Sequence, residues 1–168
     1  SSVLHSNGLT YSIILKNPLR SRQESYKIVS SLLIQAFKDI GISLSYGNES
    51  QNIYIENCFS SSTKADLIDK DGIKRIGSAQ LWKKKHLLQH GEILINPCRK
   101  IWEEVFEANY PNQNPVPISK NKIEKSLLNT IHSSWPSIKW ETTNIEQSVL
   151  DFLDSKTSKY TINLSHFD

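Results

Sequence analysis

The chain has 168 residues, of which 38% are hydrophobic and 9% are aromatic, so it is long enough to form one folded domain with a real core. Its net charge of +3 is too small to indicate a nucleic-acid partner. It also lacks the run of about 18 apolar residues that a membrane helix needs. Two cysteines, Cys58 and Cys98, cannot provide a disulfide framework. We therefore expect a soluble, cytoplasmic protein with neither nucleic acid nor membrane as a partner.

The absence of methionine bears on where the chain starts. A translated chain begins with methionine, so Ser1 is not a native start, and we expect an upstream segment to be missing. Residues 3–15 place Asn7-Gly8 between aliphatic and β-branched residues, which predicts a strand, a turn and a second strand.

A helix is predicted to follow. Ser21 and Glu24 have the spacing of a capping box, and Gly41 is a typical residue after a helix end. Between them, apolar residues recur at helical spacing and predict one buried stripe. The stripe consists of Tyr26, Val29, Leu32, Leu33, Ala36, Phe37 and Ile40.

The centre of the chain changes to a period of two, which is typical of strands. Strands are predicted at residues 53–55, 66–70, 73–82 and 87–95. Asp71-Gly72 is a turn that needs a positive φ, and residues 83–86 are a short polar link. These features together predict an antiparallel meander.

The last third of the chain predicts three helices. The first covers residues 101–106, and the second covers residues 119–134 after a Pro/Asn-rich break at residues 111–117. The third opens at a second capping box, residues 143–146, and carries Val149, Leu150 and Leu153. We treat the break as a loop and expect a single domain over residues 1–168. The apolar face of the second helix is predicted to be Ile123, Leu127, Leu128 and Ile131.

Common cofactor motifs do not occur. No two of the six glycines lie closer than five positions, which excludes Gly-x-Gly-x-x-Gly and the P-loop in this chain. His86 and His90 have a spacing that suits zinc only on a helix. On the predicted strand they would be about 13 Å apart, so we expect no metal site.

Three segments of the sequence resemble one family. They are residues 58–67 (Cys-Phe-Ser-Ser-Ser-Thr-Lys-Ala-Asp-Leu), 72–80 (Gly-Ile-Lys-Arg-Ile-Gly-Ser-Ala-Gln) and 88–94 (Leu-Gln-His-Gly-Glu-Ile-Leu). Together they are similar to the catalytic core of the biotin/lipoate protein ligase family, in the branch of lipoate-protein ligase A and the cysteine-dependent octanoyltransferases. Residues 3–12 match the segment that follows the family's Arg-Arg-x-x-Gly-Gly loop. The chain would then lack that loop and the N-terminal strands.

The resemblance implies an α+β fold, with an antiparallel-rich mixed sheet flanked by helices as in class II aminoacyl-tRNA synthetases. It also implies the attachment of a lipoyl or octanoyl group to a lysine of a lipoyl domain. That domain would belong to a 2-oxoacid dehydrogenase or to a glycine cleavage protein. An acidic lipoyl domain, or acyl carrier protein, would suit the mildly basic surface of this chain.

Lys74 is the first candidate catalytic residue. Acyl transfer needs a cation near the carbonyl oxygen that becomes negative, and a strand lysine provides one on a rigid support, although many strand lysines are simply solvated. The small residues Gly77, Ser78 and Ala79 would let an acyl chain lie close to the sheet. Cys58 is either a small buried apolar residue or, as the resemblance implies, the acyl-accepting nucleophile activated by Lys74. Three more residues are substrate-binding candidates. His90 and Gly91 are expected to sit in the sheet and support the pocket, whereas His5 follows the missing loop and is either near the acyl site or a surface histidine at a strand end.

Two enzymatic mechanisms and a non-catalytic role remain open. A transferase would take octanoate from acyl carrier protein through Cys58 and would need no cofactor, and we favour this route because of the cysteine. A ligase would activate free lipoate with ATP and Mg²⁺ through a lipoyl-adenylate. Without the upstream loop the chain could instead be a non-catalytic binding module. A biotin ligase is a weaker alternative.

Overall fold

The computed structural model describes residues 4–16, 21–47, 63–107 and 115–157. The predicted strand at 53–55, the candidate nucleophile Cys58 and residues 111–114 of the predicted loop lie outside the described residues. The chain divides into two units, residues 1–136 and 137–168, which are described separately. A single domain over residues 1–168 stays a prediction. The elements in chain order are β1 (Leu9–Lys16), α1 (Arg22–Asp39), β2 (Leu44–Tyr46), β3 (Leu67–Asp69), β4 (Lys74–Lys83), β5 (His86–Ile93), α2 (Arg99–Phe106), α3 (Lys120–Ser134) and α4 (Gln147–Thr157).

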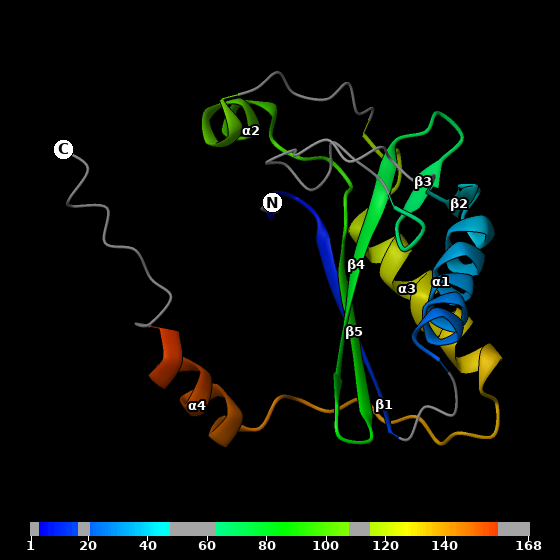
Figure 1. Ribbon diagram of the computed structural model, residues 1–168, viewed down its shortest axis with the longest axis vertical. Helices are drawn as coiled ribbons and strands as arrows, with labels where there is room; N and C mark the ends of the chain where they lie inside the picture. The colour runs from blue at the N-terminus through cyan, green and yellow to red at the C-terminus, as the bar shows by residue number, and fades with distance from the viewer. Residues whose placement is uncertain (1–3, 17–20, 48–62, 108–114, 158–168) are drawn as a thin grey trace. The chain divides into compact units, whose positions relative to one another are not determined.

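The first unit is built on a five-stranded sheet with the order β1-β5-β4-β3-β2 (Figure 1). Strands β3, β4 and β5 follow one another in sequence and in space, which confirms the predicted meander over residues 66–95. Strand β2, which the sequence did not predict, pairs with β3, and β1 adds to the free side of β5. All strand pairs in the described part are antiparallel, so the mixed sheet that we predicted shows no parallel pair there. The α+β class is confirmed.

The turns of the meander differ in how they are made. Gly72 has φ 76°, as the Asp-Gly pair predicts, because glycine has no Cβ to oppose this conformation. The long β4–β5 hairpin turns at Lys84 and Lys85 without a glycine, and Lys84 adopts φ 53°. The polar link predicted between these strands is therefore a two-residue turn.

Helix α1 begins as the sequence predicts. The Ser21 hydroxyl accepts from the backbone N–H of Glu24 at 3.3 Å, and the Glu24 carboxylate accepts from the backbone N–H of Ser21 at 3.0 Å. This reciprocal pair is the capping box, and it satisfies two amides that a helix start leaves free. The predicted stripe is confirmed in its centre, where the buried members are Val29, Leu32, Leu33, Ala36 and Phe37.

The core lies between the sheet and the two helices α1 and α3, which pack side by side (Figure 1). Helix α3 buries Ile123, but Leu128 is 49% exposed, so its predicted inward position is wrong. The reason is a small polar contact, in which the Ser126 hydroxyl donates to the Ala36 carbonyl oxygen at 2.7 Å. This contact turns Ser126 toward α1 and leaves Leu128 outside. The buried core residues are Val29, Leu33, Phe37, Leu44, Leu67, Ile76, Ile93, Ile95, Val116 and Ile123.

The predicted strand before Asn7-Gly8 is wrong for the residues that the structure describes. Residues 4–8 form no strand, and β1 begins only at Leu9. Two side-chain contacts hold this segment beside the sheet instead: Leu4 packs against the cluster of Leu94, Trp102 and Phe106, and His5 binds Glu92. The segment thus becomes part of a site rather than of the sheet.

The second unit contains α4, which begins three residues later than the predicted capping box would place it. The Thr143 hydroxyl donates to the Asn144 carbonyl oxygen at 3.2 Å, and the Glu146 carbonyl accepts from the N–H of Val149. The Thr143 hydroxyl, which was predicted to cap the helix, therefore binds the carbonyl oxygen of Asn144 instead. Across both units, none of the helices in the described ranges is long and apolar enough to cross a membrane.

Candidate functional site

A hollow of about 180 Å³ gathers residues from five separate parts of the chain. It contains all the predicted site residues except Cys58, which lies outside the described residues. We call it the Lys74 hollow. Its lining is His5, Thr10, Asp66, Lys74, Gly77, Ser78, Ala79, His90, Gly91 and Glu92.

Strand register explains why these residues meet. In the β4–β5 hairpin, Gly77 lies opposite Glu92 and Ala79 lies opposite His90. On the other side of β5, Thr10 of β1 is also opposite Glu92. Side chains of directly opposed residues are 4.5–5.5 Å apart at Cβ, so pairing alone brings the 72–80 and 88–94 segments into one site.

Lys74 is buried in an ion pair. Its Nζ lies 3.0 Å from Oδ2 of Asp66, and the two side chains are 5% and 6% exposed. The same Oδ2 accepts from the backbone N–H and the hydroxyl of Thr63, at 2.7 and 3.0 Å. The carboxylate therefore has three donors, and it holds the lysine ammonium at the wall of the hollow rather than in solvent.

Asp66 was not among our sequence candidates. It falls in the first segment of the family resemblance, but it was predicted only as a strand residue. The local pattern predicts that Asp66 begins a strand. It does not predict that Lys74, eight residues later, folds back to bind the Asp66 carboxylate. The buried pair is thus a product of the β3–β4 turn.

Gly91 is the point where the backbones of the hollow come closest. A Cβ at this position would overlap the carbonyl oxygen of Gly77 and would lie 2.7 Å from Cε1 of Tyr11. Only glycine fits such a gap, because the obstacle on one side is backbone that cannot rotate away.

A chain of hydrogen bonds supports the hairpin behind the hollow. The hydroxyls of Tyr11 and Ser78 are 2.6 Å apart, and the Gln89 amide donates to the Tyr11 oxygen at 3.2 Å. The Gln89 oxygen in turn accepts from the Gln80 amide at 2.8 Å. Gln89 is fully buried, so these bonds satisfy polar groups that would otherwise be costly to bury. Ser78 is therefore a member of a network as well as a small lining residue.

Stability should fall at alkaline pH because of Tyr11. Burial, as the largest cause, raises the pKa of Tyr11 above its ordinary value of 10.0. The folded state then holds the phenolic proton more tightly than the unfolded chain. The resulting stabilisation is complete below about pH 10 and is lost as the pH rises through the folded-state value. Thermal unfolding followed by circular dichroism should show this fall, and Tyr11→Phe should make it shallower. An identical alkaline fall in both proteins would contradict the assignment.

A second carboxylate lies at the rim of the hollow. Glu92 is 5% exposed, and its Oε2 lies 2.9 Å from Nδ1 of His5 and accepts from the Thr10 hydroxyl at 3.0 Å. A Cβ on Gly8 would overlap the Glu92 carboxylate, so the bare backbone of Gly8 leaves room for it. His90 lies exposed on β5 at the same hollow. Glu92 and Thr10 were missed by sequence analysis, because nothing local links them to His5.

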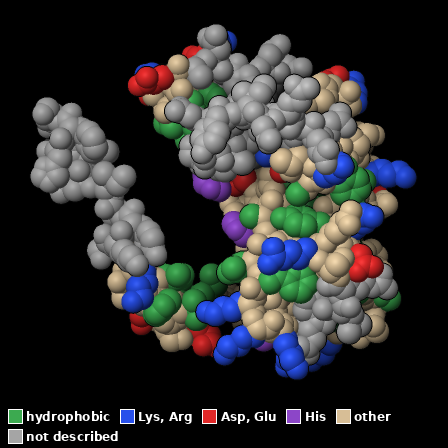
Figure 2. All heavy atoms as spheres, in the orientation of Figure 1, with side chains coloured by type: hydrophobic (Ala, Val, Ile, Leu, Met, Phe, Trp, Pro, Cys, Tyr) green, Lys and Arg blue, Asp and Glu red, His purple; other side chains and the backbone are tan. Residues whose placement is uncertain are grey.

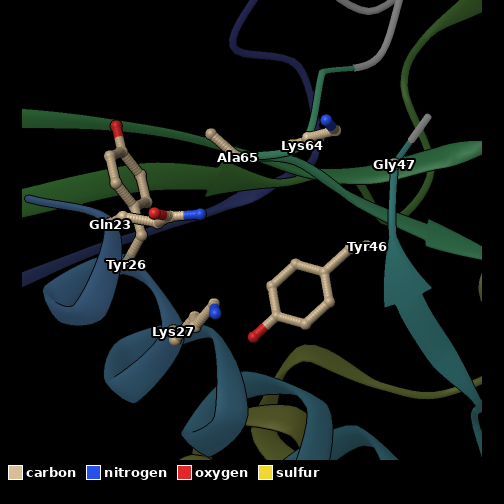
Figure 3. A pocket seen from close by; sticks show the side chains of 7 residues that line it. All are labelled: Gln23, Tyr26, Lys27, Tyr46, Gly47, Lys64 and Ala65. Carbon is tan, nitrogen blue, oxygen red and sulfur yellow. The ribbon is translucent and has the colours of Figure 1, made fainter. Parts of the chain in front are cut away.

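Another hollow, of about 520 Å³, lies between α1 and β2 and shares no lining residue with the first (Figure 3). Figure 3 shows Tyr26 and Lys27 reaching it from α1, and the Tyr46 ring entering from β2. Burial, as the largest cause, raises the pKa of Tyr26. None of its lining residues was a sequence candidate. These residues are Gln23, Tyr26, Lys27, Tyr46, Gly47, Lys64 and Ala65.

The comparisons with known proteins give relatives but no matching family profile. The Octanoyltransferase LipM of Clostridioides difficile is 38% identical over 103 residues, covering 56% of this chain and 38% of that protein. The Octanoyltransferase LipM of Halalkalibacterium halodurans is 30% identical over 123 residues, covering 66% and 44%. The one from Lysinibacillus sphaericus is 26% identical over 178 residues, covering 99% and 62%. The chain thus spans less than two thirds of the length of these relatives.

Solved structures show the same fold. A T. acidophilum protein with bound lipoic acid superimposes with a TM-score of 0.68 at 15% identity, over 90% of this chain and 61% of that one. Lipoate-protein ligase A bound with ATP gives 0.66 at 13% identity, over 94% and 64%. The described architecture is therefore that of a lipoate-protein ligase catalytic domain. Together with the octanoyltransferase relatives, this fold supports the biotin/lipoate A/B protein ligase family that the sequence resemblance predicted.

Proposed function

We propose that this protein transfers an octanoyl or lipoyl group to a lysine of a lipoyl domain, with Cys58 as the acyl-accepting nucleophile. The observation that carries the proposal is the buried Lys74–Asp66 pair on the wall of the Lys74 hollow. It is supported by relatives that are named octanoyltransferases. Cys58 and Asp66 lie in the first segment that carries the family resemblance, residues 58–67, and Lys74 lies in the second, residues 72–80.

The proposed chemistry has two steps. The Cys58 thiolate attacks the carbonyl carbon of an acyl thioester, the donor C–S bond breaks, and the donor leaves as a thiolate. A neutral lysine amine of the acceptor then attacks the Cys58 thioester, the C–S bond breaks, and loss of one proton from the nitrogen leaves an amide and the Cys58 thiolate. Lys74 contributes a fixed positive charge, which favours the Cys58 thiolate and stabilises the oxygen that becomes negative in both steps. Asp66 keeps the ammonium in place and compensates its burial.

Intact-mass measurement after incubation with octanoyl-acyl carrier protein tests the first step. The chain should gain one octanoyl group, hydroxylamine should remove it, and Cys58→Ser should abolish the hydroxylamine-sensitive adduct because an oxygen ester resists this reagent. Cys98→Ser is the matched control: Cys98 is the free cysteine that precedes α2, outside the lining of the hollow, so the adduct should persist. An octanoyl adduct that survives Cys58→Ala would contradict the proposed nucleophile.

The acceptor and donor belong to this proposal as well. A lipoyl domain of a 2-oxoacid dehydrogenase or a glycine cleavage protein is the proposed acceptor, and acyl carrier protein is the proposed donor. A solved Thermoplasma acidophilum ligase is described together with its E2 lipoyl domain. Figure 2 shows Lys and Arg side chains spread around apolar side chains on one face of the molecule, which suits an acidic partner.

A ligase reaction is the second candidate, because one structural neighbour is a ligase bound with ATP. The residues present fit an adenylate in one respect: Lys74 supplies a cation at the hollow. With Mg²⁺, the lipoate carboxylate would attack the α-phosphorus of ATP, giving a lipoyl-adenylate and releasing pyrophosphate. Lipoate-dependent exchange of labelled pyrophosphate into ATP that persists in Cys58→Ala would favour this candidate over the transferase. If neither the adduct nor the exchange occurs, the chain has no such activity by itself.

A further inference from the structure

We propose that His5 is the general base for the second step, in which the acceptor amine attacks the acyl-cysteine, and that Glu92 is its positioning residue. The inference rests on the proposed transfer function. It assigns a proton acceptor, which the Lys74–Asp66 pair does not provide, because that pair already consists of a cation and a carboxylate bound to each other.

The contacts of Glu92 determine which ring nitrogen of His5 is free. A carboxylate only accepts hydrogen bonds, so the nitrogen that lies 2.9 Å from it, Nδ1, carries a proton. In the neutral ring the other nitrogen, Nε2, is then the one with a free lone pair. This is the arrangement of a base oriented by a third group, as in nucleophilic enzymes.

Glu92 is well suited to hold the histidine. Its side chain is 5% exposed, and the Thr10 hydroxyl binds the same Oε2 that His5 contacts. The bare backbone of Gly8 leaves room for the other oxygen, which a Cβ there would overlap. The Thr10 hydroxyl therefore helps to fix the oxygen that binds His5, and the imidazole has one preferred orientation.

His5 itself is open to an incoming substrate. Its side chain is 61% exposed, yet it lines the same hollow as Lys74. Figure 2 shows histidine and acidic side chains together at one margin of the face in view. A lysine arriving from solvent would meet His5 before it reaches the wall that carries Lys74. The charged and titratable groups around His5 in the hollow are Glu92, His90, Lys74 and Asp66.

The step balances without any further reactant. The neutral amine of the acceptor lysine attacks the thioester carbonyl, and its N–H becomes acidic as the C–N bond forms. His5 Nε2 takes that proton, and the C–S bond breaks. Cys58 leaves as a thiolate, and Glu92 stabilises the His5 imidazolium until the proton passes to solvent.

Single-turnover kinetics of the full chain separate the two steps. Octanoyl-acyl carrier protein is used to load Cys58, and transfer from the loaded protein to a lipoyl domain is then followed by mass spectrometry over about pH 5–9. We expect His5→Ala to slow transfer by about 100-fold while loading changes less than about threefold. His86→Ala is the matched control, since this histidine lies exposed at the hairpin end and outside the hollow, and both steps should stay unchanged.

The pH profile distinguishes a base from a structural residue. For the wild type, the logarithm of the transfer rate should rise with slope two at acidic pH, because both the amine and His5 must lose a proton, and with slope one above. His5→Ala should give slope one throughout. In Glu92→Gln transfer should also slow, by about 100-fold, because an amide can turn its N–H toward Nδ1 and favour the wrong tautomer of His5.

The possible outcomes separate this inference from the function on which it rests. If loading fails in the wild type, the proposed function is wrong. If loading proceeds and His5→Ala transfers at the wild-type rate, or keeps slope two, the general base is another group. Equal losses in loading and transfer would mean that His5 and Glu92 only maintain the structure, and this would also overturn the inference.

Discussion

Replacing Lys74 with methionine is expected to lower the free energy of unfolding by about 3–5 kcal/mol. The methionine leaves Asp66 as a buried carboxylate, with Thr63 as a hydrogen-bond donor but without the cation. A lone buried charge costs more than the pair contributes, which is why breaking such a pair is so damaging. Urea unfolding would measure the loss. A decrease of less than about 1 kcal/mol, the range of exposed ion pairs, would mean that the pair is solvated.

The same variant should lose acyl transfer, and a double variant separates the two effects. Asp66→Leu combined with Lys74→Met removes both charges, and such replacements of buried pairs are often neutral or stabilising. We therefore expect the double variant to recover the unfolding free energy but to load octanoate on Cys58 at least about 100-fold more slowly than the wild type. Recovery of loading together with stability would show that Lys74 has a structural role only.

Replacing Gly91 with alanine is the second substitution with a large expected effect. The added methyl group would overlap the Gly77 carbonyl oxygen and press on the Tyr11 ring, so the β4–β5 and β1–β5 pairings must both shift. Inserting a methyl group into a packed interior costs about 1–3 kcal/mol. We expect the upper end of this range, because backbone cannot move aside as a side chain does.

Gly72→Ala is the control for this prediction. An alanine there meets no atom within 4 Å, and its cost comes only from the φ of 76°, about 1–2 kcal/mol. Thermal or urea unfolding of both variants should therefore show the larger loss for Gly91→Ala. If Gly91→Ala is the milder of the two, the close approach at the hollow does not constrain the fold. Loading of Cys58 should also fall in Gly91→Ala, and it should be unaffected in Gly72→Ala.

Helix α1 and the β3–β4 turn show what neighbouring residues can specify. The capping box of Ser21 and Glu24 and the glycine of the Asp71-Gly72 turn act over three or four residues, so their signals are complete in the sequence. The N-terminal segment and α3 show the limit. Residues 4–8 have strand-like composition and Leu128 has helical spacing. The contact between His5 and Glu92 nevertheless keeps residues 4–8 out of the sheet. The contact between Ser126 and Ala36 turns α3 so that Leu128 faces outward.

The residues of the Lys74 hollow also fall into two groups: those that the sequence predicted and those that only the folded structure revealed. Sequence alone selected Lys74, the small residues 77–79, His90, Gly91 and His5, because their order along the chain is characteristic of one family. Only the folded chain revealed Asp66 and Glu92, because a carboxylate in a strand pattern looks solvated until its partner is known. Those partners are eight and 87 residues away. The β3–β4 pairing brings the first pair together, and the β1–β5 pairing carries the segment before β1, with His5, to Glu92. Local sequence thus determined most of the elements and the family resemblance, whereas pairing across the sheet decided which charges are buried together, since burial is a property of the assembled fold and not of any segment.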